Sequence, residues 1–159
     1  MKDQAPAPLD PLTSHVLRER ALAMLGRREH TQQELRQALH NQGGDSAEIE
    51  ALLLELSDCH LQSDSRFAEV FTRSRAERGH GPRVIEAELQ QRGVASELIG
   101  KVMADSGYDW AACARDVRQK RFGSALPASS HERARQLRFL QYRGFTSSQS
   151  LAAIKDEND

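Results

Sequence analysis

Cysteine and aromatic residues are scarce in this chain. Of its 159 residues only two are cysteines, Cys59 and Cys113, and aromatic residues make up 5%. Two cysteines so far apart do not form a disulfide framework, and they fit the reduced thiols of a cytosolic protein. With few aromatic and β-branched residues, the composition also argues against an all-β fold.

Long apolar segments are missing as well. The longest uninterrupted apolar runs, residues 21–25 and 110–114, are five residues each, whereas a membrane-spanning helix needs about 20. The N-terminal stretch MKDQAPAPLDPLTSH has neither the basic start nor the apolar region of a secretory signal. We therefore expect a cytoplasmic protein that does not enter a membrane.

Motifs for catalysis or metal binding are absent from the sequence. The histidines are scattered and form no HExxH pair, and there is no pair of CxxC motifs. The segment Gly79-His80-Gly81 lacks the GK[ST] ending and the preceding strand of a phosphate-binding loop. We expect no enzyme activity, no metal and no cofactor.

The sequence does contain an internal repeat. Three segments align, LHNQGGDSAEI (39–49), LQQRGVASELI (89–99) and LQYRGFTSSQS (140–150), and their glycines at 43, 93 and 144 are 50 and 51 residues apart. Such a period indicates a repeated supersecondary unit. Each glycine, four residues after a leucine, is typical of the left-handed residue that ends a helix.

Start signals for helices surround these glycines. Capping-box spacing begins at Thr31, Asp45, Ser129 and Thr146, and Pro82 suits a first helical turn, whereas Ala95 cannot cap. In the third segment Ser150 replaces an isoleucine, so we expect Leu151 and Ile154 to pack in its place. Further helices are expected at about 16–28, 65–78 and 110–122.

These signals predict an all-α protein, an elongated stack of three tandem three-helix repeats with about nine helices. Stacking is expected because one unit of about fifty residues buries little apolar surface alone. The predicted organisation is an N-terminal lead, three repeats and a tail, at 1–14, 15–63, 64–106, 107–154 and 155–159.

Charge is distributed unevenly along the chain, although its formal net charge is −1. Residues 15–63 carry 5 basic and 8 acidic residues (net −3), residues 64–106 carry 7 and 7 (net 0), and residues 107–145 carry 8 and 3 (net +5). The basic third of the chain indicates an acidic or polyanionic partner.

The stretch RARQLRFLQYRGF (133–145) is the most basic helix of that third. At about 100° per residue, Ala134, Leu137 and Leu140 share a core-facing side. The opposite side carries Arg135, Arg138 and Tyr142, beside Phe139 and Arg143. A solvated face is the ordinary explanation for such arginines, but Glu132 is the one acid nearby, and Arg115, Arg118, Lys120 and Arg121 extend the same patch.

Three segments carry a resemblance to a known family. REHTQQELRQAL (28–39), DSRFAEVFTRSRAERGHGPRVIEAELQQRGV (64–94) and RARQLRFLQYRGF (133–145) closely resemble the RecX family of bacterial regulatory proteins, over about residues 16–154. The resemblance implies tandem three-helix repeats. It also implies a modulator of the recombinase RecA that binds in the groove of the RecA filament on single-stranded DNA, inhibits strand exchange and ATP hydrolysis, and favours loss of filament.

Helical phase and charge select the residues expected to contact that partner. They are Arg118, Lys120, Arg121, Arg135, Arg138, Tyr142 and Arg143 in the third repeat, with Arg73, Arg78 and Arg83 in the second. The alternative is a direct DNA-binding protein that places a helix in the major groove or holds single strands. A helical scaffold for some other protein is a third possibility. The sequence has no heptad repeat of apolar residues that would pair two copies in a coiled coil, so a monomer is expected.

Overall fold

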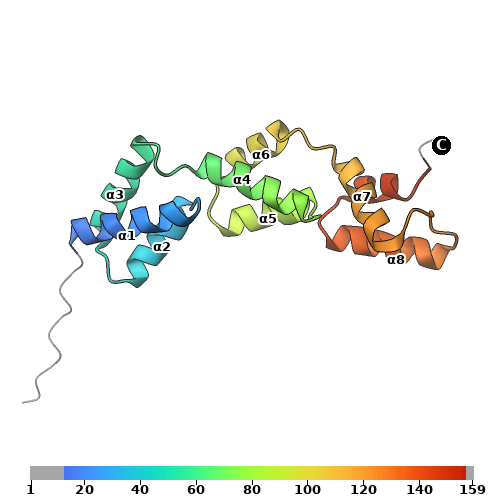
Figure 1. Ribbon diagram of the computed structural model, residues 1–159, viewed down its shortest axis with the longest axis horizontal. Coiled ribbons are helices and arrows are strands. Elements are labelled where there is room, and N and C mark those ends of the chain that lie inside the picture. The colour runs from blue at the N-terminus through green and yellow to red at the C-terminus, as the bar shows by residue number, and fades with distance from the viewer. Residues whose placement is uncertain (1–12, 157–159) are drawn as a thin grey trace, which may run out of the picture. The chain divides into compact units, whose positions relative to one another are not determined.

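The computed structural model describes residues 13–156, and these form nine α-helices and no strand (Figure 1). In chain order the helices are α1 Ser14–Arg27, α2 Gln32–Asn41, α3 Ser46–Asp58, α4 Asp64–Glu77, α5 Pro82–Gln91, α6 Ser96–Asp105, α7 Trp110–Phe122, α8 Ser130–Tyr142 and α9 Ser147–Ala153. The all-α prediction with three helices per repeat is confirmed. Within the described range, no helix is long and apolar enough to cross a membrane.

Two of the predicted segments fall largely outside the described residues. The lead, 1–14, contributes only Thr13 and Ser14, where Thr13 caps α1. The tail, 155–159, contributes only its first two residues. The described chain divides between Asp64 and Ser65 into two compact units. The first unit holds the first repeat, and the second unit holds the other two.

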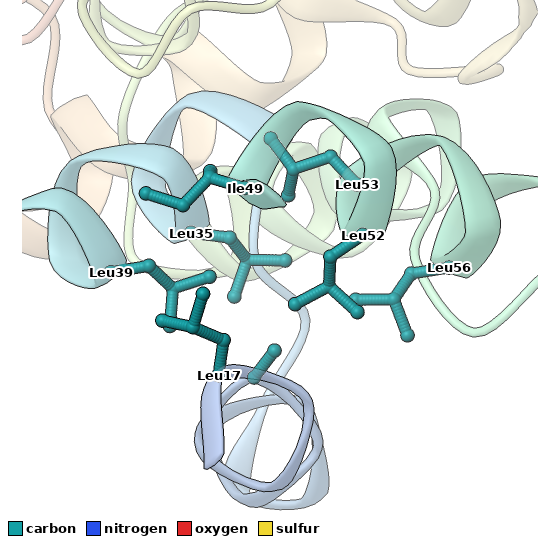
Figure 2. Packing of buried hydrophobic residues seen from close by; sticks show 8 residues of the cluster. Leu17, Leu35, Leu39, Ile49, Leu52, Leu53 and Leu56 are labelled. Atoms are coloured by element: carbon teal, nitrogen blue, oxygen red, sulfur yellow. The ribbon is translucent and has the colours of Figure 1, made fainter. Parts of the chain in front are cut away.

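The core of the first unit is built almost entirely from leucine. Leu17 of α1, Leu35 and Leu39 of α2, and Leu53 and Leu56 of α3 are at most 1% exposed. Figure 2 shows these side chains pointing toward one another from the three helices. Their helical spacing gives each helix a narrow apolar stripe, and three such stripes close one small core. Truncation of one of them to alanine typically costs about 2–5 kcal/mol.

The second unit contains two apolar clusters. Phe67, Ile85, Leu89 and Ile99 lie in the cluster of the second repeat. In the third repeat the cluster consists of Ala114, Val117, Leu140, Phe145, Ala153 and Ile154. Trp110, at the start of α7, packs against both clusters. The single tryptophan of the chain therefore links the cores of the two repeats.

The repeated glycines end their helices as the sequence predicts. Gly43, Gly93 and Gly144 have φ angles of 91°, 86° and 104°, in the left-handed region. Each N–H donates to the carbonyl three residues earlier, and the next residue donates five back to the preceding leucine. This pair of bonds is the Schellman motif, which satisfies the last carbonyls of a helix.

Most of the predicted caps are also present. Thr31 and Thr146 form complete capping boxes with Glu34 and Gln149. The side chains of Asp45 and Ser129 accept N–H bonds three residues on, from Glu48 and Glu132. Pro82 occupies the first turn of α5, and Ala95 makes no side-chain cap.

The prediction for the last helix is half wrong. Ser150 is fully buried in the position that Ile49 and Ile99 occupy in the other repeats, and Ile154 is buried as expected, but Leu151 is exposed. The helical phase of the position is thus retained, although the side chain is small and polar. Phe145 supplies apolar bulk in the same cluster, where the second repeat has the smaller Val94.

Candidate interaction surface of the third repeat

Helices α7 and α8 pack against each other and carry most of the basic residues of the third repeat (Figure 1). Lys120, Arg121, Arg135 and Arg138 are exposed. Among residues 13–156, no carboxylate forms an ion pair with Lys120, Arg121 or Arg138. Two of the three acids of this repeat are engaged, since Asp109 caps α7 and Glu132 lies 3.5 Å from Arg135. The surface therefore keeps an uncompensated positive charge.

In the first repeat, by contrast, three arginines form ion pairs with glutamates. Arg18 pairs with Glu55, Arg28 with Glu34 at 3.0 Å, and Arg36 with Glu50 at 2.5 Å. The hydrogen bond between Arg36 and Glu50 raises the pKa of Arg36 and lowers that of Glu50. These pairs add little stability each, but they neutralise three of the five arginines of that repeat. The contrast makes the third repeat the basic surface of the chain.

Arg118 is a correction to the predicted surface. Helical phase placed it with the exposed cations, but its side chain is only 2% exposed. Its guanidinium donates to the carbonyl oxygens of Gly123, Ser124 and Ala125 at 3.4, 3.4 and 3.1 Å. The segment after α7 folds back over it, which the phase of one helix cannot reveal. Arg118 thus holds this turn and is not part of the exposed surface.

Two phenylalanines between the helices fix several of the guanidinium groups. Phe122 and Phe139 meet edge to face with centroids 5.2 Å apart. Arg121 lies 5.6 Å from the first ring and 6.0 Å from the second, and Arg135 lies 5.4 Å from Phe122. Arg143 lies 5.8 Å from Phe139. These contacts restrict the arginines before any partner arrives.

The predicted face of α8 is present. Arg135, Arg138 and Tyr142 are all exposed, and Tyr142 is 86% exposed. Leu140 is buried on the other side, and Leu137 packs against the same core. A tyrosine so fully in solvent gains nothing from the core, and such residues are common anchors of interfaces.

Arg143 lies where the second and third repeats meet. It is half-buried and donates to the carbonyl oxygen of Arg78 at 3.2 Å. The backbone N–H groups of Gly81 and Arg83 donate to the carbonyls of Arg143 and Gly144, at 2.8 and 2.9 Å. Backbone bonds between the loops thus join the two repeats directly.

A groove of about 420 Å³ lies beside this junction. Its residues are Ala76 and Glu77 from the end of α4, Arg78 and Gly79 from the turn that follows, Cys113, Asp116, Val117, Lys120 and Arg121 from α7, and Phe139 and Arg143. Burial, and then Asp116 and Asp109, raise the pKa of the Cys113 thiol. The structure therefore gathers Arg78, Lys120, Arg121 and Arg143 in one place. Sequence reasoning named these cations but missed the groove, because no pattern links α4 with α7.

The other two cations predicted in the second repeat, Arg73 and Arg83, do not line the groove. Arg83 is exposed on α5. Arg73 lines a separate hollow of about 630 Å³ with Glu69, Lys101 and Asp105, where charges of both signs compensate one another. Although this hollow is larger, its balanced charge gives it less preference for an anionic partner.

The part of the chain that the structure describes contains no group of three or more His, Cys, Asp or Glu side chains suited to a metal. The fold and the surface thus define an all-α repeat protein with a basic face on its third repeat. Family models described as the first, second and third three-helix domains of RecX match residues 18–56, 63–103 and 108–154. The chain belongs to the RecX family.

Curated relatives agree with this family. The chain is 49% identical to "Regulatory protein RecX" of Halorhodospira halophila over 92% of each chain. It is 41% identical to the protein of that name in Pseudomonas fluorescens Pf-5, over 88% of this chain and 89% of the relative. A crystal structure of RecX from Lactobacillus salivarius matches with a TM-score of 0.78 at 18% identity, over 89% of this chain and 94% of that one. At that identity the structural match supports the fold alone.

Proposed function

We propose that this protein binds RecA and its filament on single-stranded DNA and inhibits the ATPase and recombinase activities of that filament. The observation that carries the proposal is the match of all three repeats to the RecX domains, together with relatives named regulatory proteins. The protein would act in the cytoplasm as a monomer, without catalysis or a cofactor of its own.

Physical features of the chain support such a role. Tandem repeats offer separate surfaces at several points along the chain, and a filament offers the same subunit surface many times. Linked contacts of this kind favour the assembled filament over a free subunit. Among the described residues, Lys120 and Arg121 of α7 and Arg138 of α8 have no carboxylate partner. They suit an acidic partner surface, and charge complementarity of this sort speeds encounter and gives specificity.

The test is RecA's hydrolysis of ATP on saturating single-stranded DNA while this protein is added in amounts well below those of RecA. We expect hydrolysis to fall at these substoichiometric amounts, because one bound molecule affects more than one subunit of the filament. In parallel, binding to the same DNA without RecA is measured at two salt concentrations. Inhibition that sets in only when the protein covers the DNA would contradict the proposal.

Direct DNA binding is the second candidate, and Tyr142 is the observation that favours it. An exposed aromatic ring beside Arg135 and Arg138 is the arrangement on which a base stacks while its phosphate meets a guanidinium. This candidate predicts affinity for single strands that falls steeply with salt.

A pair of variants separates this candidate from general loss of charge. Tyr142→Ala removes the ring without altering charge, and Arg27→Glu reverses an exposed cation on α1, far along the sequence from α8. If single strands bind on α8, the first variant lowers their affinity by about 1–3 kcal/mol, and the second leaves it nearly unchanged. Equal affinities for the wild type and Tyr142→Ala would remove Tyr142 as a stacking residue.

A further inference from the structure

The groove beside the junction of the second and third repeats is built as one piece. One wall is the end of α4 and the turn after it, with Arg78 and Gly79, and the other is the face of α7 that carries Val117 and Lys120. Both walls belong to the same compact unit. The backbone bonds from Gly81 and Arg83 to the loop after α8 hold the second repeat against the third. The groove is therefore formed before a partner binds, which lowers the entropy lost on binding.

Its lining combines apolar surface with charge. Ala76, Val117 and Phe139 supply apolar atoms, and all three are buried or half-buried. Lys120 and Arg121 lie close by on the last turns of α7, exposed and without a carboxylate partner among the described residues. The groove thus suits an apolar side chain of a partner that is flanked by negatively charged groups.

We propose that this groove docks a protein segment in which an aliphatic side chain stands next to one or more carboxylates. The aliphatic group would lie against Ala76 and Val117, and the carboxylates would pair with Lys120 and Arg121. The inference rests on the proposed function, since it assigns that segment to RecA. It adds to the proposed function by separating the protein-binding groove from the exposed face of α8.

The lining favours a protein over a nucleic acid. Arg121 and Arg143 already lie about the ring of Phe139, with centroid distances of 6.0 and 5.8 Å, and Phe122 meets it edge to face. The ring is therefore not open to a stacking base. Two acids, Glu77 and Asp116, also line the groove. They repel a phosphate chain, whereas a peptide can place its own donors against them.

Charge reversal in the groove tests the assignment. Lys120→Glu puts a carboxylate where the partner's carboxylate would bind. The matched control is Arg133→Glu, which makes the same change of charge at an exposed position of α8 outside the groove. The probes are RecA filaments on single-stranded DNA, and the same DNA alone. We expect Lys120→Glu to weaken filament binding at least about tenfold, and the control to weaken it no more than about twofold.

Cys113 provides a second readout that does not depend on a disruptive variant. It lines the groove, and in a Cys59→Ser background it is the remaining thiol of the chain. Alkylation is followed at mildly alkaline pH, because burial raises the pKa of this thiol. We expect RecA filaments to slow the alkylation of Cys113, and the DNA alone to leave its rate unchanged.

The outcomes distinguish the groove from the proposed function. Equal protection by DNA alone would make the occupant a nucleic acid and overturn the inference. A second outcome is that the wild type inhibits RecA while Cys113 stays unprotected and Lys120→Glu remains fully active. This would overturn the groove as the binding site and leave the proposed function intact. A wild-type protein that neither binds RecA filaments nor inhibits their ATPase would overturn both.

Discussion

Substitution of Gly81 by alanine tests the junction of the second and third repeats. A Cβ atom at this position would lie 2.4 Å from the carbonyl carbon of Gly144 and 2.5 Å from the nitrogen of Phe145. Both are backbone atoms, so they cannot rotate away as a side chain can. The φ angle of Gly81 is −89°, which any residue adopts. The cost of the substitution is therefore steric, without backbone strain at the site itself.

The loss of stability can be estimated from the contacts between the two loops that must break to make room for the methyl group. The bonds from Gly81 N to Arg143 O and from Arg83 N to Gly144 O, at 2.8 and 2.9 Å, would be lost or lengthened. Each contributes about 1 kcal/mol net, and overpacking costs a further 1–3 kcal/mol or so. We expect the second unit to lose about 3–5 kcal/mol of unfolding free energy, summing those terms.

The assay is urea unfolding followed by the fluorescence of Trp110, which packs against the cores of both repeats. Gly100→Ala is the matched control. Gly100 lies within α6, and a Cβ there meets nothing within 4 Å. We expect this control to gain about 0.5–1 kcal/mol, because alanine favours the helix over glycine. A stability of Gly81→Ala within about 0.5 kcal/mol of the wild type would refute the close packing of the two loops.

Three further variants test other parts of the structure. Arg118→Leu leaves the carbonyls of 123–125 without their donor, so we expect a loss of about 1–3 kcal/mol and faster proteolysis in that turn; unchanged urea unfolding and proteolysis would contradict the buried role. Thr31→Ala removes the capping box of α2, and circular dichroism should record a loss of about 1 kcal/mol in the first unit; a loss near zero would contradict the cap. Burial, and then Arg143, lower the pKa of His80 below its ordinary 6.5, so the folded state binds fewer protons than the unfolded state. Stability should therefore fall as the pH drops through about 6.5 toward the lowered pKa, and the wild type should lose more than His80→Gln; an equal loss in both proteins would contradict the assignment.

The repeat and its helix ends could be predicted from the sequence because they depend on local chemistry. A glycine at the C′ position, as at Gly43 and Gly93, is selected by its own φ angle. The box at Thr31 depends on a spacing of three residues. The apolar stripe of α2 follows the helical period. Such signals are complete within a dozen residues, and the structure reproduces each of them.

The interaction surface could be predicted only in part. Exposure of Arg138 and Tyr142 follows from helical phase, because a single helix against one core has one outward side. The burial of Arg118 could not be predicted in this way, because the turn that covers it folds back from beyond the end of α7. The groove did not follow either, since its walls are brought together by backbone bonds between loops more than sixty residues apart, at Gly81 and Arg143.

The most direct test of the proposed function compares two targets at one salt concentration. The protein is sedimented with RecA filaments assembled on single-stranded DNA, and with the same DNA alone, at a salt concentration high enough to remove phosphate-driven binding. If the protein regulates the filament, it sediments with the filaments and stays in solution with the DNA. If it sediments with neither target, or equally with both, filament regulation is contradicted.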